Sequence, residues 1–244
     1  MLTDNAFLAC ETAVRGHDPD RYLSALFAPE AKRRHLFALY ALNHELAHVA
    51  EAVREPMMGE IRLQWWREGI EGARKGEPRA HDVLKALAET FKAHDLPQRL
   101  FDEMIDARAA DFSGAPFAHD RERDLYLDAT SGNLMRLAAR LLGAGAGLDT
   151  LAHNAGLAYG LAGLLRSEAH HTARGKRYLP NSETARHAAR GHFDQARQER
   201  IPREAMAAFL PASLVPLYLR ESGADVPLHR KQLAMLWSAV RGRL

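Results

Sequence analysis

The chain has 244 residues, enough for one large domain or two small ones. With 47% hydrophobic and 26% charged residues it is composed like an ordinary globular protein, and a net charge of +2 gives no reason to expect a nucleic-acid partner. The single cysteine, Cys10, excludes an internal disulfide, and neither a signal peptide nor an apolar run of membrane-spanning length is recognisable, so we expect a cytoplasmic protein in a reducing compartment.

Apolar residues recur at helical spacing through almost the whole chain, and no hairpin signature occurs. The fold class is therefore predicted to be all-α. No repeat or shift in composition marks a boundary, so residues 1–244 are expected to form a single domain. A loop and turn is expected at 17–28, with further breaks at 76–78, 114–116, 143–147 and 174–180. The expected helices cover 4–15, 29–55, 57–75, 80–93, 97–111, 120–142, 150–166, 181–190, 194–201, 202–220 and 227–243.

The stretch 35–53 is the expected centre of the core, because its apolar residues form one helical stripe. The same helix carries His44-Glu45-Leu46-Ala47-His48, which matches the HExxH pattern of zinc hydrolases, with two imidazoles one turn apart and a glutamate as base. A chain with 13 histidines can produce so short a pattern by chance, and no further ligand motif follows it. We therefore expect His44 and His48 to make packing or polar contacts.

Large and small side chains mark two more helices. Trp65 and Trp66 are expected in the core, because large aromatic side chains dominate buried area. Gly156, Gly160 and Gly163 follow one another at spacings of four and three, which predicts either close backbone contact or room left for a ligand. The small residues at 130–133 predict a close helix contact or a kink within 120–142.

Several segments together carry a family resemblance. They are Arg33, Tyr40-Ala41-Leu42, Arg62-Leu63-Gln64-Trp65-Trp66-Arg67, Leu165-Arg166 and Arg174-Gly175-Lys176-Arg177-Tyr178-Leu179-Pro180. In this order and spacing the segments resemble the squalene/phytoene synthase family over most of the chain. The resemblance implies a single-domain isoprenoid (prenyl) synthase-like helical bundle around a central cavity.

Enzymes of that family couple two prenyl diphosphates head to head, and two aspartate-rich motifs hold the Mg²⁺ that grips the diphosphates. Here the adjacent aspartates of the first motif fall on Ala47 and His48, and only Glu51 keeps an acidic group. The second motif has lost its carboxylates, and its positions carry Gly160, Gly163, Ser167, His170 and His171. Mg²⁺ needs oxygen ligands, and carboxylates are the usual protein source, so we expect no metal site and no catalytic residues.

Within the family the chain looks closest to a degenerate branch, the mitochondrial complex I assembly factor and its bacterial relatives. It resembles that branch through Asn43-x-Glu45-Leu46-Ala47, through the helix at 62–66, and through the loss of the aspartates. No transit peptide is recognisable, which favours a bacterial member. The resemblance thus implies a non-catalytic binding protein that assists assembly of respiratory complex I, the NADH dehydrogenase. Two alternatives stay open, an active prenyltransferase of the squalene/phytoene synthase type and an HExxH zinc hydrolase.

The resemblance also implies a set of ligand-binding residues, Arg33, Tyr40, Glu51, Arg166, Arg174, Lys176 and Tyr178. We expect an apolar cavity beside the central helix, with Arg166 and Tyr178 near its mouth. The expected partner is a complex I subunit, and a prenyl lipid in the cavity is a second candidate. The Arg-rich stretch 186–200 would suit an acidic partner or a peripheral contact with the inner face of the membrane. No cofactor is expected, and Mg²⁺ belongs only to the active alternative.

Overall fold

The computed structural model describes residues 2–53, 55–220 and 226–244, and these contain helices and no strand. The predicted all-α fold class is therefore confirmed. None of the helices in the described ranges combines the length and the apolar character needed to cross a membrane.

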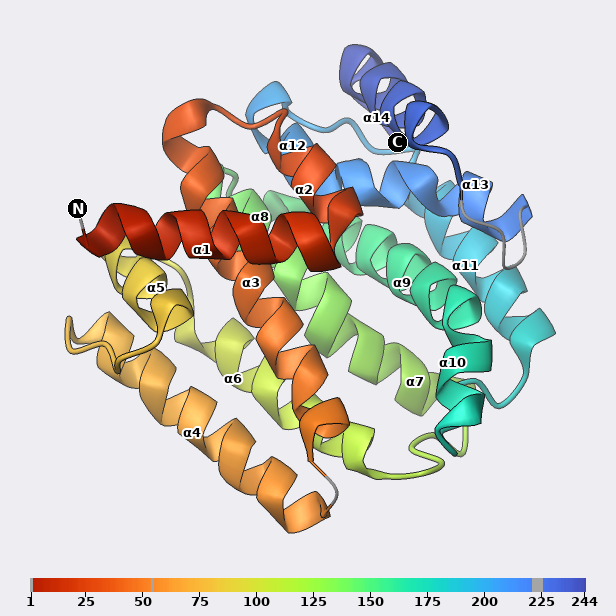
Figure 1. Cartoon of the computed structure of the whole chain (residues 1–244). Coiled ribbons are helices and arrows are strands. Elements are labelled where there is room, and N and C mark those ends of the chain that lie inside the picture. Colours follow the sequence, from red (N-terminus) through yellow and green to blue (C-terminus); the bar gives the residue numbers. More distant parts are fainter. Residues whose placement is uncertain (1, 54, 221–225) are drawn as a thin grey trace.

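The helices follow one another with short connections. Their bounds are α1 Leu2–His17, α2 Pro19–Ala25, α3 Glu30–Ala52, α4 Pro56–Arg74, α5 Asp82–Ala93, α6 Gln98–Ala107, α7 Asp120–Leu127, α8 Asn133–Leu141, α9 Asp149–Arg166, α10 Glu168–Ala173, α11 Ser182–Ala196, α12 Met206–Phe209, α13 Val215–Arg220 and α14 Leu228–Arg241. Short 3₁₀ segments cover Arg108–Phe112 (η1), Ala146–Leu148 (η3), Arg203–Ala205 (η4) and Leu210–Leu214 (η5), and a π-helical turn covers Asp128–Gly132 (η2). The longest helix, α3 (Glu30–Ala52), packs against α1, α2, α4, α5 and α8, while α9, α11, α13 and α14 lie on the other side of the molecule (Figure 1).

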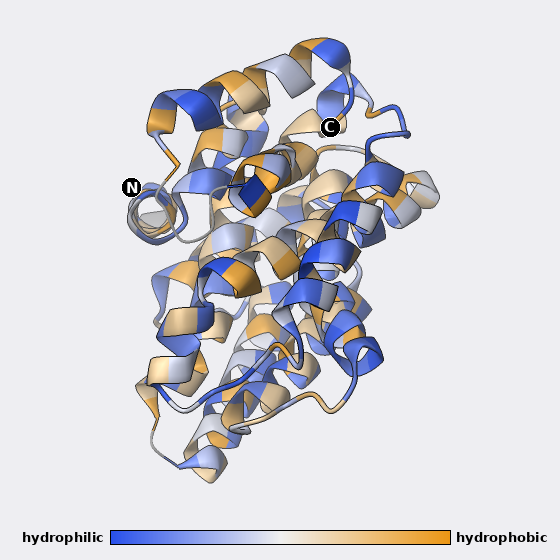
Figure 2. Ribbon diagram, turned by 90° about the vertical axis from the view of Figure 1, so that its right-hand side faces the viewer, coloured by the Kyte–Doolittle hydropathy of each residue, from blue (hydrophilic) through white to orange (hydrophobic). Residues whose placement is uncertain are grey.

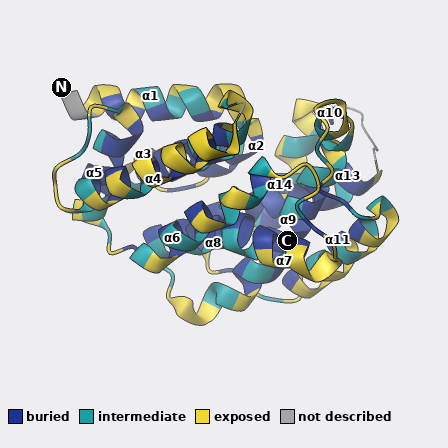
Figure 3. Ribbon diagram, turned by 90° about the horizontal axis from the view of Figure 1, so that it is seen from below, coloured by how far each residue is buried: buried dark blue, intermediate teal, exposed yellow. Residues whose placement is uncertain are grey.

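Helix α3 supplies the centre of the core, as its apolar stripe predicts. Leu36, Leu39, Leu42 and Leu46 are all buried, because α3 packs against α1, α5 and α8. Apolar and polar residues alternate along most helices (Figure 2), and the buried residues lie on the faces turned toward neighbouring helices (Figure 3). The two tryptophans of α4 differ in burial, because Trp66 is buried and Trp65 is 37% exposed. The core position predicted for Trp65 is therefore wrong.

The long helix predicted for 120–142 is interrupted where its small residues lie. The π-helical turn η2 separates α7 from α8, and its Gly132 lies directly against Gly156 of α9. A Cβ built on Gly156 would stand 2.5 Å from the Gly132 Cα. Two glycines thus let the backbones of η2 and α9 touch, which brings α9 close to the centre of the bundle.

The loop predicted for 17–28 is wrong, because residues 19–25 form helix α2. Asp18 caps it, since its carboxylate accepts a hydrogen bond from the backbone N–H of Arg21 at 3.1 Å. Pro19 stands in the first turn, where a missing N–H costs no hydrogen bond. The segment predicted as a loop and turn therefore forms a helix, and this helix brings Asp20 into the interior.

Two predictions near the C-terminus are also wrong. Helix α11 continues through Gly191 to Ala196, and no separate helix forms at 194–201. Burial of Ala185, Ala189 and Ala196 along one face offsets the roughly 1 kcal/mol that a glycine costs within a helix. The segment 202–220 is not one helix but the succession η4, α12, η5 and α13. Pro211 and Pro216 lack the N–H that a continuous α-helix would need.

Candidate functional site

A polar cavity opens at the C-terminal end of α3, between α3, η1, α10 and the loop that follows α10. It has a volume of about 550 Å³ and adjoins a second space of about 450 Å³ that extends along α9. Ala47, Glu51, Arg108 and His171 line both parts. The cavity lies beside the central helix, as the sequence suggests, but its wall is strongly charged, so the prediction of an apolar cavity is wrong.

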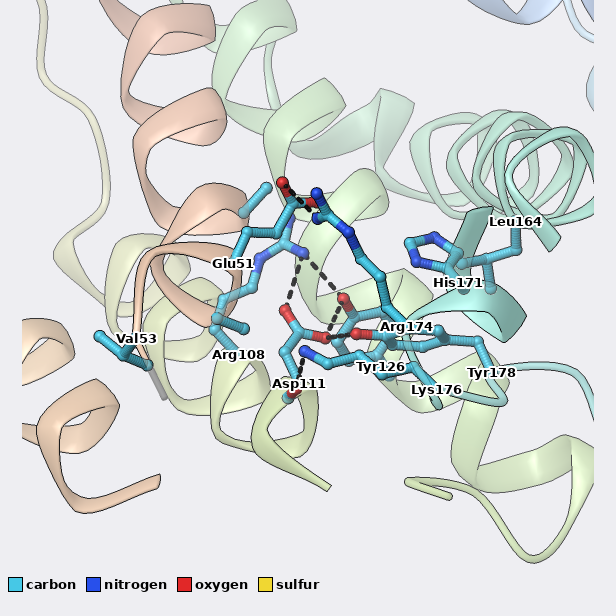
Figure 4. Close-up of a pocket in the computed structure, with 12 residues that line it drawn as sticks. Glu51, Val53, Arg108, Asp111, Tyr126, Leu164, His171, Arg174, Lys176 and Tyr178 are labelled. Carbon is cyan, nitrogen blue, oxygen red and sulfur yellow. Dashed lines mark hydrogen bonds and ion pairs between the residues drawn. The ribbon is translucent and has the colours of Figure 1, made fainter. Parts of the chain in front are cut away.

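Asp111 is the centre of the first part of the cavity (Figure 4). Its carboxylate accepts hydrogen bonds from the hydroxyls of Tyr126 at 2.8 Å and Tyr178 at 3.1 Å, and forms an ion pair with Arg108 at 3.2 Å. The ammonium of Lys176 donates to the backbone carbonyl of the same residue at 2.7 Å. Burial raises the pKa of both tyrosines, so they remain neutral hydrogen-bond donors at neutral pH. Three side chains thus engage the Asp111 carboxylate and a fourth its backbone carbonyl, which leaves the carboxylate less capacity for a metal ion.

Glu51 is the last carboxylate of the first motif, and it is paired. Arg174 reaches across the cavity mouth to within 3.1 Å of it, and His48 approaches at 3.2 Å (Figure 4 shows the Arg174 contact). Burial alone would raise the pKa of Glu51, but the hydrogen bond and charge of Arg174, helped by His48 and His170, outweigh it and lower the pKa. Glu51 is therefore ionised at neutral pH and holds the loop after α10 against α3.

A second buried carboxylate closes the far end of the cavity. Asp20 of α2 accepts hydrogen bonds from the hydroxyls of Tyr159, at 3.1 Å, and Tyr218, and pairs with Lys231 of α14 at 2.9 Å. Arg166 lies 3.7 Å from the same carboxylate and 3.9 Å above the Tyr218 ring. This cluster joins α2, α9, α13 and α14, and it presents Arg166 to the cavity.

Most positions that the resemblance assigns to metal-binding carboxylates do meet at the cavity. Ala47, Ser167 and His171 line it, together with Gly163 at the position of the family's asparagine, whereas His48 and His170 do not. A Cβ added to Gly163 would have no neighbour within 4 Å, which makes this glycine cavity wall, whereas Gly156 is a close backbone contact. Within the described residues, no three His, Cys, Asp or Glu side chains converge in a way that could hold a metal ion. The residues present therefore do not fit the Mg²⁺ of the family.

The histidines of the HExxH pattern make ring contacts. His44 stacks on His17 with ring centroids 4.2 Å apart, and on His48 at 5.5 Å. Burial, followed by the neighbouring His17, lowers the pKa of His44. His17 is a third imidazole in this row, but no three His, Cys, Asp or Glu side chains among the described residues are placed so that they could hold a metal ion. The expectation of packing and polar contacts agrees with this geometry.

Five of the seven predicted ligand-binding residues lie at the cavity, and two do not. Glu51, Arg166, Arg174, Lys176 and Tyr178 line it. Arg33 instead donates to the backbone carbonyls of Leu26 and Ala28, which fixes the turn between α2 and α3. Tyr40 is buried in the core beside the guanidinium of Arg21, and burial raises its pKa to about 12.

Sequence reasoning missed the polar residues that hold the cavity together, Arg108, Asp111, Tyr126, Asp20, Tyr159 and Tyr218. One signal for the first two was present, an Arg and an Asp three residues apart near the end of a predicted helix. The partners of Asp20 lie 139 to 211 residues away in the chain, so spacing could not reveal them.

Known proteins resemble this chain along most of its length. The family model described as squalene/phytoene synthase matches residues 14–210. The rat protein named NADH dehydrogenase (ubiquinone) complex I, assembly factor 6 is 28% identical over 245 residues, which cover 89% of this chain and 74% of that protein. The human protein of the same name is 30% identical over 70% of this chain, which spans only 52% of the human protein. A phytoene synthase of Thermus thermophilus is 29% identical over 68% of this chain and 56% of its own length.

Solved structures show the same fold. A dehydrosqualene synthase superposes with a TM-score of 0.80 at 14% identity, over 98% of this chain and 96% of the other. A squalene synthase from Alicyclobacillus acidocaldarius gives a TM-score of 0.71 at 17% identity, over 98% and 95%. The predicted isoprenoid synthase-like bundle is thereby confirmed, as is the resemblance to both synthases and assembly factors. The chain belongs to the squalene/phytoene synthase family.

Proposed function

We propose that this protein is a non-catalytic member of the family that assists assembly of respiratory complex I, the NADH dehydrogenase. The observation that carries the proposal is the lining of the cavity. At the cavity, the positions of the family's metal-binding carboxylates carry Ala47, Ser167 and His171, and the remaining Glu51 is paired with Arg174. Departing diphosphate must be neutralised in the transition state, and the family does this with a metal cluster held by two aspartate-rich motifs, which this chain lacks.

Asp111 does not replace the missing carboxylates. It lies on η1, where neither aspartate-rich motif has a residue, and Arg108, Tyr126 and Tyr178 already engage both of its oxygens. A metal ion at Asp111 would compete with the largely buried guanidinium of Arg108 for the same carboxylate, and loss of that ion pair is unfavourable. The cavity therefore keeps its polar cluster as a structural element.

The charge of the cavity suits an anionic ligand. Five cationic side chains and two carboxylates line its two parts, the cations being Arg21, Arg108, Arg166, Arg174 and Lys176. Lys176 is held by a carbonyl and Arg174 is half exposed, so both can turn to a ligand. We propose Glu51, Arg166, Arg174, Lys176 and Tyr178 as the ligand-contacting set, with a prenyl lipid bearing an anionic head group as the candidate ligand.

The similarity to assembly factors supports the choice of client. Proteins named complex I assembly factor 6 match between 65% and 89% of this chain, including those of rat, human and Drosophila. The proposed partner is a complex I subunit, and the proposed place of action is the cytoplasm with a peripheral contact at the inner face of the membrane. An active prenyltransferase is the second candidate, favoured by the 29% identity to a phytoene synthase.

Deletion of the gene in its host separates the two candidates. The proposal predicts less assembled NADH dehydrogenase on native gels, with unchanged squalene and carotenoid levels. Normal NADH dehydrogenase with depleted isoprenoids would favour the active prenyltransferase.

Rescue of the deletion by variants tests the cavity itself. Arg174→Glu places a second acid beside Glu51 at the cavity mouth, so it should restore assembly poorly. Arg177→Glu changes an exposed residue of the same loop outside the cavity lining, so it should restore assembly fully. Equal rescue by both variants would contradict a role for the cavity in assembly.

A further inference from the structure

Helix α14 turns an apolar stripe toward solvent. Leu233, Leu236, Trp237 and Val240 are 62%, 52%, 61% and 74% exposed. Their spacing of three, four and seven residues places them on one face of the helix. Figure 2 shows hydrophobic residues between hydrophilic ones on this helix, at the top of the molecule. Four large apolar side chains on one exposed helix face indicate a contact surface.

The opposite face of α14 is fixed to the bundle. Met235 is fully buried, Ser238 is 6% exposed, and the ammonium of Lys231 reaches inward to the carboxylate of Asp20 at 2.9 Å. The helix cannot roll to cover its outer stripe without breaking this buried ion pair, which would be costly. The apolar stripe is therefore a permanent feature of the surface.

The stripe continues onto the turn between α2 and α3. Phe27, which is 41% exposed, lines a groove of about 510 Å³ together with Leu236 and Val240. The buried residues Ile201 and Met206 also line this groove. The apolar surface is thus wider than one helix and has a concave margin.

The segment that forms the stripe is basic. Residues 226–244 contain four Lys or Arg and no Asp or Glu. Lys231 is used inside, while the guanidinium of Arg241 lies 4.9 Å from the Trp237 ring, and Arg203 lines the groove with it. An apolar stripe that bears a tryptophan and is flanked by arginines is typical of a helix lying in the interface of an anionic bilayer.

We propose that α14 and Phe27 dock this protein on an anionic phospholipid surface, with α14 parallel to the membrane plane. The apolar side chains would enter the boundary between head groups and acyl chains, and Arg241 and Arg243 would meet lipid phosphates. The stretch 186–200 is a weaker candidate, because Arg186 donates to the Leu219 carbonyl and Arg197 pairs with Asp194. The proposal locates the membrane contact of the proposed function. The test of membrane docking uses neither the cavity nor complex I. Membrane docking and the proposed assembly function can therefore fail separately.

Vesicle flotation with the full chain tests the proposal. Wild-type protein should bind vesicles of phosphatidylcholine with phosphatidylglycerol, bind phosphatidylcholine vesicles at least about tenfold more weakly, and dissociate at high salt. Leu233→Ser/Trp237→Ser should weaken binding at least about tenfold. The matched control is Met57→Ser/Ile61→Ser, which removes two equally exposed apolar side chains from α4 and should leave binding unchanged.

Fluorescence gives a second measurement that does not depend on the folding of the double variant. The emission of Trp237, taken as the difference between wild type and Trp237→Phe, should shift to the blue on adding the anionic vesicles. Absence of vesicle binding, or binding that Leu233→Ser/Trp237→Ser leaves unchanged, would overturn the proposal. A dimer that this double variant dissociates, without vesicle binding, would also overturn it and assign the surface to a second copy of the chain.

Discussion

The three glycines of α9 provide a graded test of the cavity wall. An alanine Cβ at Gly156 would stand 2.5 Å from the Cα and 2.7 Å from the nitrogen of Gly132, both backbone atoms that cannot move aside alone. At Gly160 the nearest atom is a methyl of Leu127 at 2.8 Å, the end of a flexible side chain. At Gly163 nothing lies within 4 Å. The three substitutions therefore add the same methyl group to three different environments on one helix.

Two opposing terms set the expected free energies of unfolding. Replacing Gly by Ala within a helix stabilises by about 1 kcal/mol. Overpacking costs about 1–3 kcal/mol, and contact with backbone belongs at the upper end of that range. Gly156→Ala should therefore lower the free energy of unfolding by about 2 kcal/mol, and Gly160→Ala should change it little. Gly163→Ala should raise it by up to about 1 kcal/mol.

Thermal unfolding measures this series, with each kcal/mol expected to shift the midpoint by about 2–4 °C for a protein of this size. The midpoint should rise for Gly163→Ala and fall for Gly156→Ala, with Gly160→Ala between them. If Gly163→Ala lowered the midpoint as much as Gly156→Ala, the space beside Gly163 would not exist and the cavity would be smaller than described.

Three further predictions concern the buried groups Asp111 and His35 and the histidines of the HExxH pattern. Asp111→Asn should destabilise by about 3 kcal/mol because it leaves the buried guanidinium of Arg108 without a counter-charge, whereas Asp194→Asn, in an exposed pair, should change stability by less than about 1 kcal/mol in denaturant titrations. Burial lowers the pKa of His35 to about 4 from 6.5, so the unfolded chain binds the extra proton first. Stability should therefore fall as the pH drops from about 6.5 towards 4, by roughly 3 kcal/mol, and a midpoint as pH-dependent in His35→Gln as in wild type would refute this assignment. Purified protein should contain no stoichiometric zinc by elemental analysis; one equivalent that disappears in His48→Ala would restore the zinc hydrolase hypothesis.

The sequence predicted the central part of the fold well, because local signals and tertiary contacts agree there. The apolar stripe of α3 has one period and one buried face, so its spacing alone located the core. The π-helical turn at Asp128–Gly132 falls at the small residues that suggested an irregularity. Helix α2 was missed because an aspartate followed by a proline starts a turn or a helix equally well, and buried contacts of Asp20 decide the outcome.

The candidate site was predicted in position but not in character. The order of the motifs located the cavity, and five of the seven ligand-binding residues lie on its wall. Its polarity follows from hydrogen bonds between distant residues, such as Tyr178 to Asp111, which no local pattern specifies. Arg33 and Tyr40 lie in segments that resemble the family, but in this chain they support the turn before α3 and the core. Their ligand-binding role, and the single-domain organisation of residues 1–244, stay predictions.

The most direct test of the account is an assay of diphosphate release from farnesyl and geranylgeranyl diphosphate in the presence of Mg²⁺, with a phytoene synthase as positive control. Since Ala47, Ser167 and His171 offer no carboxylate and Asp111 is held by Arg108, Tyr126 and Tyr178, release should equal that of a control without protein. Release well above that control, abolished by a chelator of Mg²⁺, would contradict the account and identify this protein as a working prenyltransferase.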